Sequence, residues 1–285
     1  MSVYAKYDTM SKTYDLNRKA NGAHLYLGLI YTLTGKPAEN VYLLDAGCGT
    51  GNHSKYLLEH GLGRVAMFDA NEGMLERARD KLRAFATPGQ VTVRENRLPA
   101  IPYADGEFDA VMFNQVLHHL DQHDFTRDRM DYPNIEASLE EAYRVLKPNG
   151  VVLINMSTPH QLTYGKWYYH LFPNGCRRDA LRNPEPSFLL KTMNHIGFSM
   201  PRILVEPMDL LATPDRYFYA EGPLDEGWRS SDSSVASALP EEIESMARAV
   251  HALKAEGKLR DYMLENDRMR AHVGQYSILV AQKKA

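Results

Sequence analysis

The chain has 285 residues, 44% of them hydrophobic and 24% charged, so it can fill at least one sizeable core. Its 33 basic and 36 acidic residues give a net charge of −3, which provides no global positive field for nucleic acid. No apolar stretch approaches the ~18 residues of a membrane span or marks a signal peptide, and two cysteines are too few for a disulfide framework. We therefore expect a cytoplasmic protein that binds neither nucleic acid nor a membrane.

In chain order, short apolar runs alternate with helical patterns. Strands are expected at residues 41–45, 64–69, 91–95, 108–113 and 151–155, and the helices between them at 53–60, 72–86 and 135–146. This alternation is typical of a parallel sheet with helices on both faces. The carboxyl-terminal part adds a helix and two strands, expected at 187–197, 202–208 and 276–281.

Two stretches interrupt this alternation, at 157–185 and 209–275. The first is rich in Tyr, Trp, Arg and Pro, and the second contains a Ser-rich loop followed by helical patterns at 243–253 and 259–270. We interpret both as insertions into one domain rather than as a second domain.

A glycine-rich turn follows the first strand and precedes the first helix, with glycines at alternate positions: Gly47, Gly49 and Gly51. Such a turn lets the backbone approach a ligand that side chains would block. Asp45 ends the first strand, and Asp69 ends the second, where an acidic side chain can bind a ribose diol. The G-x-G-x-G spacing disfavours a dinucleotide site, and no Lys-Ser/Thr pair completes a phosphate-binding loop. The pattern predicts a cofactor site.

This constellation resembles the class I S-adenosylmethionine-dependent methyltransferases. The resemblance spans residues 41–156 and rests on the segments Asp45–Gly51, Asp69, Phe108–Val111, Leu117–Leu120 and Tyr143–Gly150. It implies a Rossmann-like α/β fold, in which a seven-stranded, mostly parallel sheet has helices on both faces and an antiparallel last strand. It also implies that S-adenosyl-L-methionine is the cofactor.

The resemblance assigns the methionine and ribose parts of the cofactor to the turn residues Gly47, Cys48, Gly49 and Gly51. Asp45 would bind the amino group, directly or through water, and Asp69 would bind the ribose hydroxyls. Ala70 and Met74 would lie along the adenine.

Two further pairs complete the implied cofactor site. The family often places Asp and a small residue after the third strand to bind the adenine amino group, whereas this chain has Asn96 and Arg97 there. Arg has no acceptor, so Asn96 or a backbone carbonyl would accept from the amine. Asn114 and Gln115, which end the fourth strand, would border the sulfonium and the substrate.

The resemblance extends to the amino terminus, where Tyr14 and its neighbours are similar to a segment that folds over the cofactor. Ordinary helix packing explains these residues as well. The implied organisation is a helical lid segment at 1–40 and a methyltransferase domain at 41–285, with helical cap insertions at 157–185 and 209–275.

His118 and His119 are the candidate general bases, which the reaction needs only if the acceptor must lose a proton. The alternative is that Leu-His-His-Leu, common in this family, has no catalytic role. His123 adds a third imidazole, but no second cluster supplies the remaining ligands, so no metal is expected.

The insertions supply the candidate substrate residues, which are aromatic or basic: Tyr164, Trp167, Tyr168, Arg177, Arg178, Tyr217 and Tyr219. Four basic against two acidic residues give 157–185 a charge of +2, which favours a carboxylate-bearing or aromatic acceptor. The alternative is that the aromatic residues pack the cap and the arginines are solvated.

The sequence thus predicts in-line methyl transfer to a small molecule in a capped pocket. A methyltransferase for RNA or protein is the first alternative, disfavoured by the net charge and by Asn114-Gln115-Val116-Leu117 in place of Asn/Asp-Pro-Pro-Tyr/Phe. A non-catalytic cofactor-binding protein is the second. The sequence leaves a homo-oligomer open.

Overall fold

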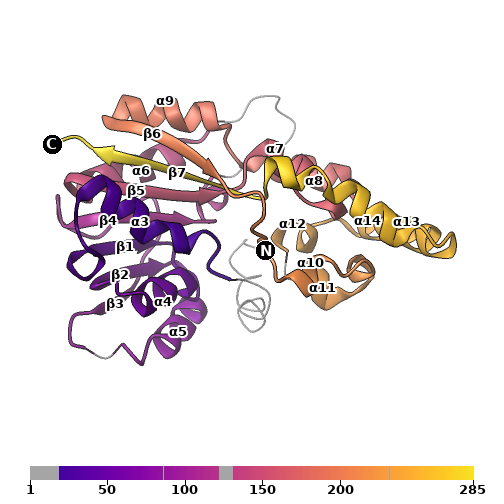
Figure 1. Ribbon diagram of the computed structural model, residues 1–285, viewed down its shortest axis with the longest axis horizontal. Coiled ribbons are helices and arrows are strands. Elements are labelled where there is room, and N and C mark those ends of the chain that lie inside the picture. The colour runs from indigo at the N-terminus through magenta and orange to yellow at the C-terminus, as the bar shows by residue number, and fades with distance from the viewer. Residues whose placement is uncertain (1–18, 86, 122–130, 231) are drawn as a thin grey trace.

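The computed structural model of the chain describes residues 19–85, 87–121, 131–230 and 232–285. Figure 1 shows two parts, a sheet with helices on both faces and a group of further helices beside one end of the sheet. Tyr14 and His123 lie outside the described residues.

The sheet has seven strands in the order β3-β2-β1-β4-β5-β7-β6. Their bounds are β1 Tyr42–Ala46, β2 Arg64–Asp69, β3 Val91–Glu95, β4 Phe108–Asn114, β5 Leu146–Met156, β6 Phe198–Val205 and β7 Ser277–Lys283. β7 runs antiparallel to both of its neighbours, and the pairs from β3 to β5 are parallel. The predicted mostly parallel sheet with an antiparallel last strand is confirmed.

Helices cover both faces, and their bounds are α3 Ala23–Thr34, α4 Asn52–Glu59, α5 Glu72–Lys81, α6 Pro133–Val145 and α9 Pro186–Ile196. Successive residues of β4 show why its sequence is apolar without alternation. Val111 and Phe113 join the apolar cluster with α6 and α9, whereas Ala110 and Met112 join the cluster with α3, α4 and α5. Burying one such large side chain stabilises the fold by roughly 1.5–3 kcal/mol.

The two inserted stretches form one body, which we call the cap. Its helices are α7 Pro159–Tyr164, η3 Trp167–Leu171, α8 Pro173–Arg182, α10 Pro214–Tyr217, η4 Gly222–Leu224, α11 Glu226–Ser230, α12 Ser233–Ala236, α13 Pro240–Ala255, α14 Leu259–Asp267 and α15 Arg270–Val273. Trp167 and Phe172 from the first stretch share an apolar cluster with Tyr217, Met246 and Met263 from the second.

The segment before β1 packs mainly on the sheet. A short turn, η1 Ala38–Asn40, precedes the first strand. Tyr26 and Ile30 of α3 are fully buried in the sheet core. Residues 19–22 precede α3 and lie toward the carboxyl ends of the strands. There, Lys19 forms an ion pair with Asp209, the first residue of the second cap stretch.

The starts of two strands differ from the sequence prediction by four or five residues. β5 begins at Leu146, five residues earlier than expected, because Leu146 pairs with Phe108 of β4 across a bulge. β6 begins at Phe198, four residues earlier than expected, because it follows directly on the glycine that ends α9.

Candidate functional site

The glycine turn is held in a conformation that favours glycine. Gly47 has φ 77°, and a Cβ there would lie 2.5 Å from Cγ2 of Val116. Gly49 has φ 53°, but a Cβ there would meet no atom of the described residues within 4 Å. Gly47 therefore allows close packing against the loop after β4, and Gly49 leaves an open face toward a ligand.

Asp69 connects this turn to the end of β2. Its Oδ2 accepts a hydrogen bond from the backbone N–H of Gly49 at 2.8 Å, and its Oδ1 accepts one from Asn71 N–H at 3.0 Å. Asn71 in turn caps α5, since its Oδ1 accepts from Met74 N–H at 2.9 Å. Burial raises the pKa of Asp69 above its ordinary value, although the backbone N–H groups oppose this shift. The carboxylate is thus fixed beside the open face of Gly49.

Asp45 lies beneath the turn and is 1% exposed. Ser54 Oγ donates to its Oδ2 at 2.7 Å, whereas Oδ1 accepts no hydrogen bond from any of the described residues. Burial raises the pKa of Asp45 to about 7. A buried carboxylate oxygen without a donor is costly, so Oδ1 fits a cationic amino group at this position.

The turn, Asp69 and the ends of β4 and β5 line one pocket that extends to the cap. It encloses about 1580 Å³, part of which is open to solvent. The predicted residues on its wall are Gly47, Cys48, Gly49, Asp69, Ala70, Met74, Asn96, Arg97, Asn114, Gln115, His118 and His119. Asp45 and Gly51 do not line it, because Asp45 lies behind the turn and Gly51 packs on Met67 of the sheet core. Burial raises the pKa of the Cys48 thiol well above its ordinary value, which makes it a poor nucleophile.

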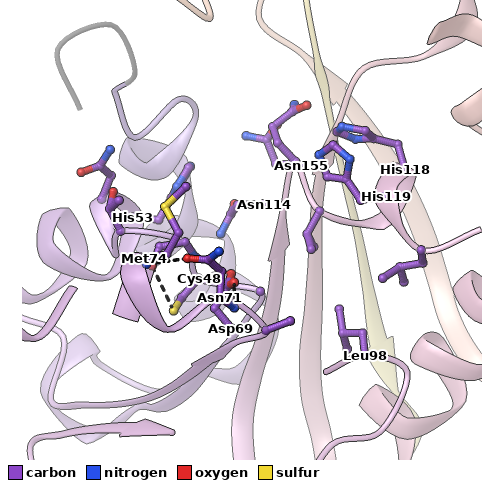
Figure 2. A pocket seen from close by; sticks show the side chains of 18 of the residues that line it. Cys48, His53, Asp69, Asn71, Met74, Leu98, Asn114, His118, His119 and Asn155 are labelled. Atoms are coloured by element: carbon purple, nitrogen blue, oxygen red, sulfur yellow. Dashed lines mark hydrogen bonds between the residues drawn. The ribbon is translucent and has the colours of Figure 1, made fainter. Parts of the chain in front are cut away.

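Figure 2 shows how the labelled residues divide between the two sides of the pocket. Asp69, Asn71 and Met74 gather near the glycine turn, and His118 and His119 lie on the other side. The two imidazoles belong to a short turn, η2 Leu117–His119, with ring centroids 3.9 Å apart. Both line the pocket.

Asn96 follows β3, where the adenine amino group was expected. Its Nδ2 donates to the carbonyl oxygen of Ala100 at 2.6 Å, which turns the acceptor Oδ1 in another direction. The role of Asn96 as the adenine acceptor stays a prediction.

A network of amides at the ends of β4 and β5 was missed by the sequence reasoning. Gln115 adopts φ 51°, and its Nε2 donates to Oδ1 of Asn155 at 2.9 Å. Asn155 Nδ2 donates to the carbonyl oxygen of Asn21 at 2.8 Å, which attaches the amino-terminal segment to the pocket. An available signal was the polar Asn155 at the end of the apolar run 151–154.

Tyr26 and His53 support this network from α3 and α4. Tyr26 O–H donates to Oδ1 of Asn114 at 2.6 Å, and the His53 ring Nε2 lies 3.0 Å from the carbonyl oxygen of Asn21. Burial lowers the pKa of His53 to about 4, so its ring is neutral at physiological pH.

None of the seven predicted substrate residues lies on the pocket wall, which corrects their placement: Tyr164, Trp167, Tyr168, Arg177, Arg178, Tyr217 and Tyr219. Trp167, Tyr168 and Tyr217 are buried in the cap core, as the packing alternative proposed. Trp167 Nε1 donates to the carbonyl oxygen of Tyr217 at 2.8 Å.

The other four are not part of the pocket lining. Arg178 forms a bidentate ion pair with Glu242 of α13, and Arg177 is exposed. Tyr164 and Tyr219 are 39% and 48% exposed. The cap instead presents smaller and polar residues, which the composition gave no reason to select: Leu162, Lys166, Asp179, Asn183 and Ser234.

Within the described ranges, no group of three or more His, Cys, Asp or Glu residues is arranged to hold a metal ion. Over the same residues, no helix is long and apolar enough to cross a membrane.

Comparisons with known proteins agree with this geometry. Residues 44–154 match a family model described as a methyltransferase domain. A demethylmenaquinone methyltransferase of Oceanobacillus iheyensis is 29% identical over 174 residues, which cover 60% of this chain and 66% of that protein. The chain thus spans slightly less than two thirds of this relative.

Two solved structures share the fold. One is a putative methyltransferase from an antibiotic biosynthesis pathway of Anabaena variabilis, with TM-score 0.67 and 19% identity over 90% of this chain and 96% of that chain. The other is a (4+2) cyclase, with TM-score 0.57 and 18% identity over 99% of this chain and 95% of that chain. Residues 44–154 therefore match a methyltransferase domain, and the chain has the fold of these two solved structures.

Proposed function

We propose that this protein transfers a methyl group from S-adenosylmethionine to a small-molecule acceptor bound between the sheet and the cap. One observation carries the proposal: a single pocket is lined both by the glycine turn with Asp69 and by residues of the cap. A cofactor held at the first set would thus face an acceptor held at the second. The cap also limits the size of an acceptor, which disfavours RNA or a folded protein.

In this proposal, the residues near the turn hold the cofactor. Asp69 binds the ribose hydroxyls, and Oδ1 of Asn96 accepts from the adenine amine. Asp45 lies behind the turn, so it binds the amino group through water. The cofactor supplies a methyl group that its sulfonium already makes electrophilic. The work of the protein is therefore to align the acceptor and to exclude water.

The acceptor is a small molecule without the carboxylate that the sequence favoured. That expectation depended on four basic residues of 157–185. Three of them, Arg177, Arg178 and Arg182, do not line the pocket, and the fourth, Lys166, forms an ion pair with Asp232. The Oceanobacillus relative is named for demethylmenaquinone, so a hydroxylated aromatic ring is a suitable first candidate.

His118 or His119 acts as the general base if the acceptor must lose a proton. Both imidazoles lie on the pocket wall, on the side away from Asp69. Replacing the base with alanine would lower kcat and alter the pH dependence of the rate. An alanine variant with an unchanged pH profile would show that the replaced histidine is not the base.

The test is an acceptor screen with isotope-labelled S-adenosylmethionine and mass detection of the product. The panel contains dihydroxylated naphthalenes, phenols and amines, and calorimetry with S-adenosylhomocysteine runs beside it. A product that carries the labelled methyl group supports the proposal. Cofactor binding without any product would favour a non-catalytic cofactor-binding protein.

A further inference from the structure

Four buried polar residues of the cap form a wall of the pocket opposite the cofactor residues. Lys166, Asp179, Asn183 and Ser234 are each between 3% and 5% exposed, and all four line the pocket. They come from separate segments, which lie before η3, in α8, directly after α8 and in α12. Buried polar groups are costly unless each has a partner, so an atom of this wall that has none is a candidate contact for a ligand.

The charges in this cluster neutralise one another. Lys166 Nζ lies 3.0 Å from Oδ2 of Asp232, and Arg182 donates to Oδ1 of Asp179 at 2.6 Å. Tyr169 O–H contacts both carboxylates, at 3.2 Å to Asp232 and 3.4 Å to Asp179. Two cations therefore balance two anions, and a ligand carboxylate placed here would lie beside two carboxylates without a cation of its own.

Asn183 leaves one buried acceptor without a donor. Its Nδ2 donates to the carbonyl oxygen of Asp179 at 2.9 Å, and this bond fixes the orientation of the amide. Its Oδ1 is buried and accepts no hydrogen bond from any of the described residues. Buried amide oxygens are nearly always paired, so a ligand hydroxyl or N–H group suits this atom.

Apolar side chains also line this pocket. They come from the loops after β3 and β4 and from α7: Leu98, Val116, Leu120 and Leu162. They offer apolar surface to a ligand that contacts both Asn183 and the cofactor residues, which favours an apolar body.

We propose that the acceptor is an uncharged molecule with an apolar body and a hydroxyl or N–H group that donates to Oδ1 of Asn183. This inference rests on the proposed function and specifies the chemical class of its substrate. Asn183 is thus a residue that determines specificity, and it acts at the end of the acceptor remote from the glycine turn.

The test compares three naphthalene probes at pH 7 by calorimetry, with the full chain saturated with S-adenosylhomocysteine. 2-Naphthol can donate to Asn183, 2-methoxynaphthalene has the same ring without the donor, and 2-naphthoate carries a negative charge. We expect 2-naphthol to bind roughly tenfold more tightly than either of the others, as loss of one buried hydrogen bond predicts. Asn183→Leu should remove the preference over 2-methoxynaphthalene, and Asn183→Asp should retain part of it.

Asn266→Leu is the matched control. The Asn266 amide also donates to the carbonyl oxygen four residues earlier in a cap helix, but it does not line the pocket. This variant should keep the wild-type preference. Equal or tighter binding of 2-naphthoate, a preference that survives in Asn183→Leu, or failure of all three probes to bind would overturn the inference. Loss of S-adenosylhomocysteine binding in the wild-type protein would instead contradict the proposed function.

Discussion

Asp45 shows how one buried side chain links the fold to cofactor affinity. Only one of its carboxylate oxygens has a hydrogen-bond donor, and burial holds its pKa near 7 instead of near 4. In the proposed site, the carboxylate is ready to pair with an ammonium group but is half protonated at neutral pH. The local glycine pattern predicted the position of this aspartate, whereas its pKa depends on burial by the whole sheet.

We expect the affinity for S-adenosylhomocysteine to fall about tenfold between pH 8 and pH 6. As the pH falls below about 7, Asp45 becomes protonated and loses the charge that pairs with the amino group. Calorimetry at the two pH values measures the effect. Asp45→Asn should bind more weakly and lose this pH dependence. His53 does not contribute, because its pKa of about 4 keeps it neutral over the whole range. A variant that keeps the full dependence would show that another group titrates.

The two glycines of the turn should respond differently to alanine. Gly47→Ala places a methyl group 2.5 Å from Val116 at a positive φ, so we expect a loss of roughly 1–3 kcal/mol in the free energy of unfolding. Gly49→Ala meets no such clash in the described residues, so its cost is smaller, but its methyl group enters the cofactor side of the pocket. Urea unfolding and S-adenosylhomocysteine calorimetry measure both effects. Equal stability losses with unchanged affinity for Gly49→Ala would contradict this assignment.

At the scale of elements, the strands and the glycine turn could be predicted because their signals are local. The run from Phe108 to Phe113 is apolar because both faces of the sheet are covered there. This local pattern predicts a strand even when the neighbouring strands are unknown. The cap could not be predicted in the same way. Trp167 is a packing residue because Tyr217 lies beside it, and that contact joins positions fifty residues apart. The amino-acid composition of a segment does not distinguish aromatic residues that line a substrate pocket from aromatic residues that pack in a core.

The cap core gives a direct test of this distinction. Trp167 is fully buried, so Trp167→Ala should lower the free energy of unfolding by roughly 3–5 kcal/mol. Tyr164→Ala removes a side chain that is 39% exposed and lies off the pocket wall, so we expect at most about 1 kcal/mol and an unchanged KM. Chemical denaturation and steady-state kinetics separate the two. A raised KM in Tyr164→Ala would show that this tyrosine contacts the substrate after all.

At the scale of the whole molecule, the pocket is built by two bodies with different tasks. The sheet supplies the glycine turn, Asp69 and the amides of β4 and β5, whereas the cap supplies Lys166, Asp179, Asn183 and Ser234. The two predicted insertions therefore form one surface that faces the sheet. The sequence indicated where the insertions are, but their shared surface depends on contacts between 157–185 and 209–275 that no local pattern contains.

Hydrogen exchange should resolve the two sides of the pocket. S-adenosylhomocysteine alone should slow exchange mainly in residues 45–52 and 69–74, which surround the cofactor side. Addition of 2-naphthol should then slow exchange in α8 and α12 of the cap, with little further change at the turn. Mass spectrometry of peptides measures both steps. Protection of the cap by S-adenosylhomocysteine alone, with none added by 2-naphthol, would contradict the division of tasks.

The place of β7 has a consequence for the order in which the chain can fold. β7 comes last in the sequence, yet it lies between β5 and β6 and forms the only hydrogen-bonded link between them among the described residues. During synthesis, β5 therefore remains an open edge and β6 has no partner until residues 277–283 leave the ribosome. Completion of the sheet thus waits for residues 277–283, and the whole cap is made while the sheet is still unfinished.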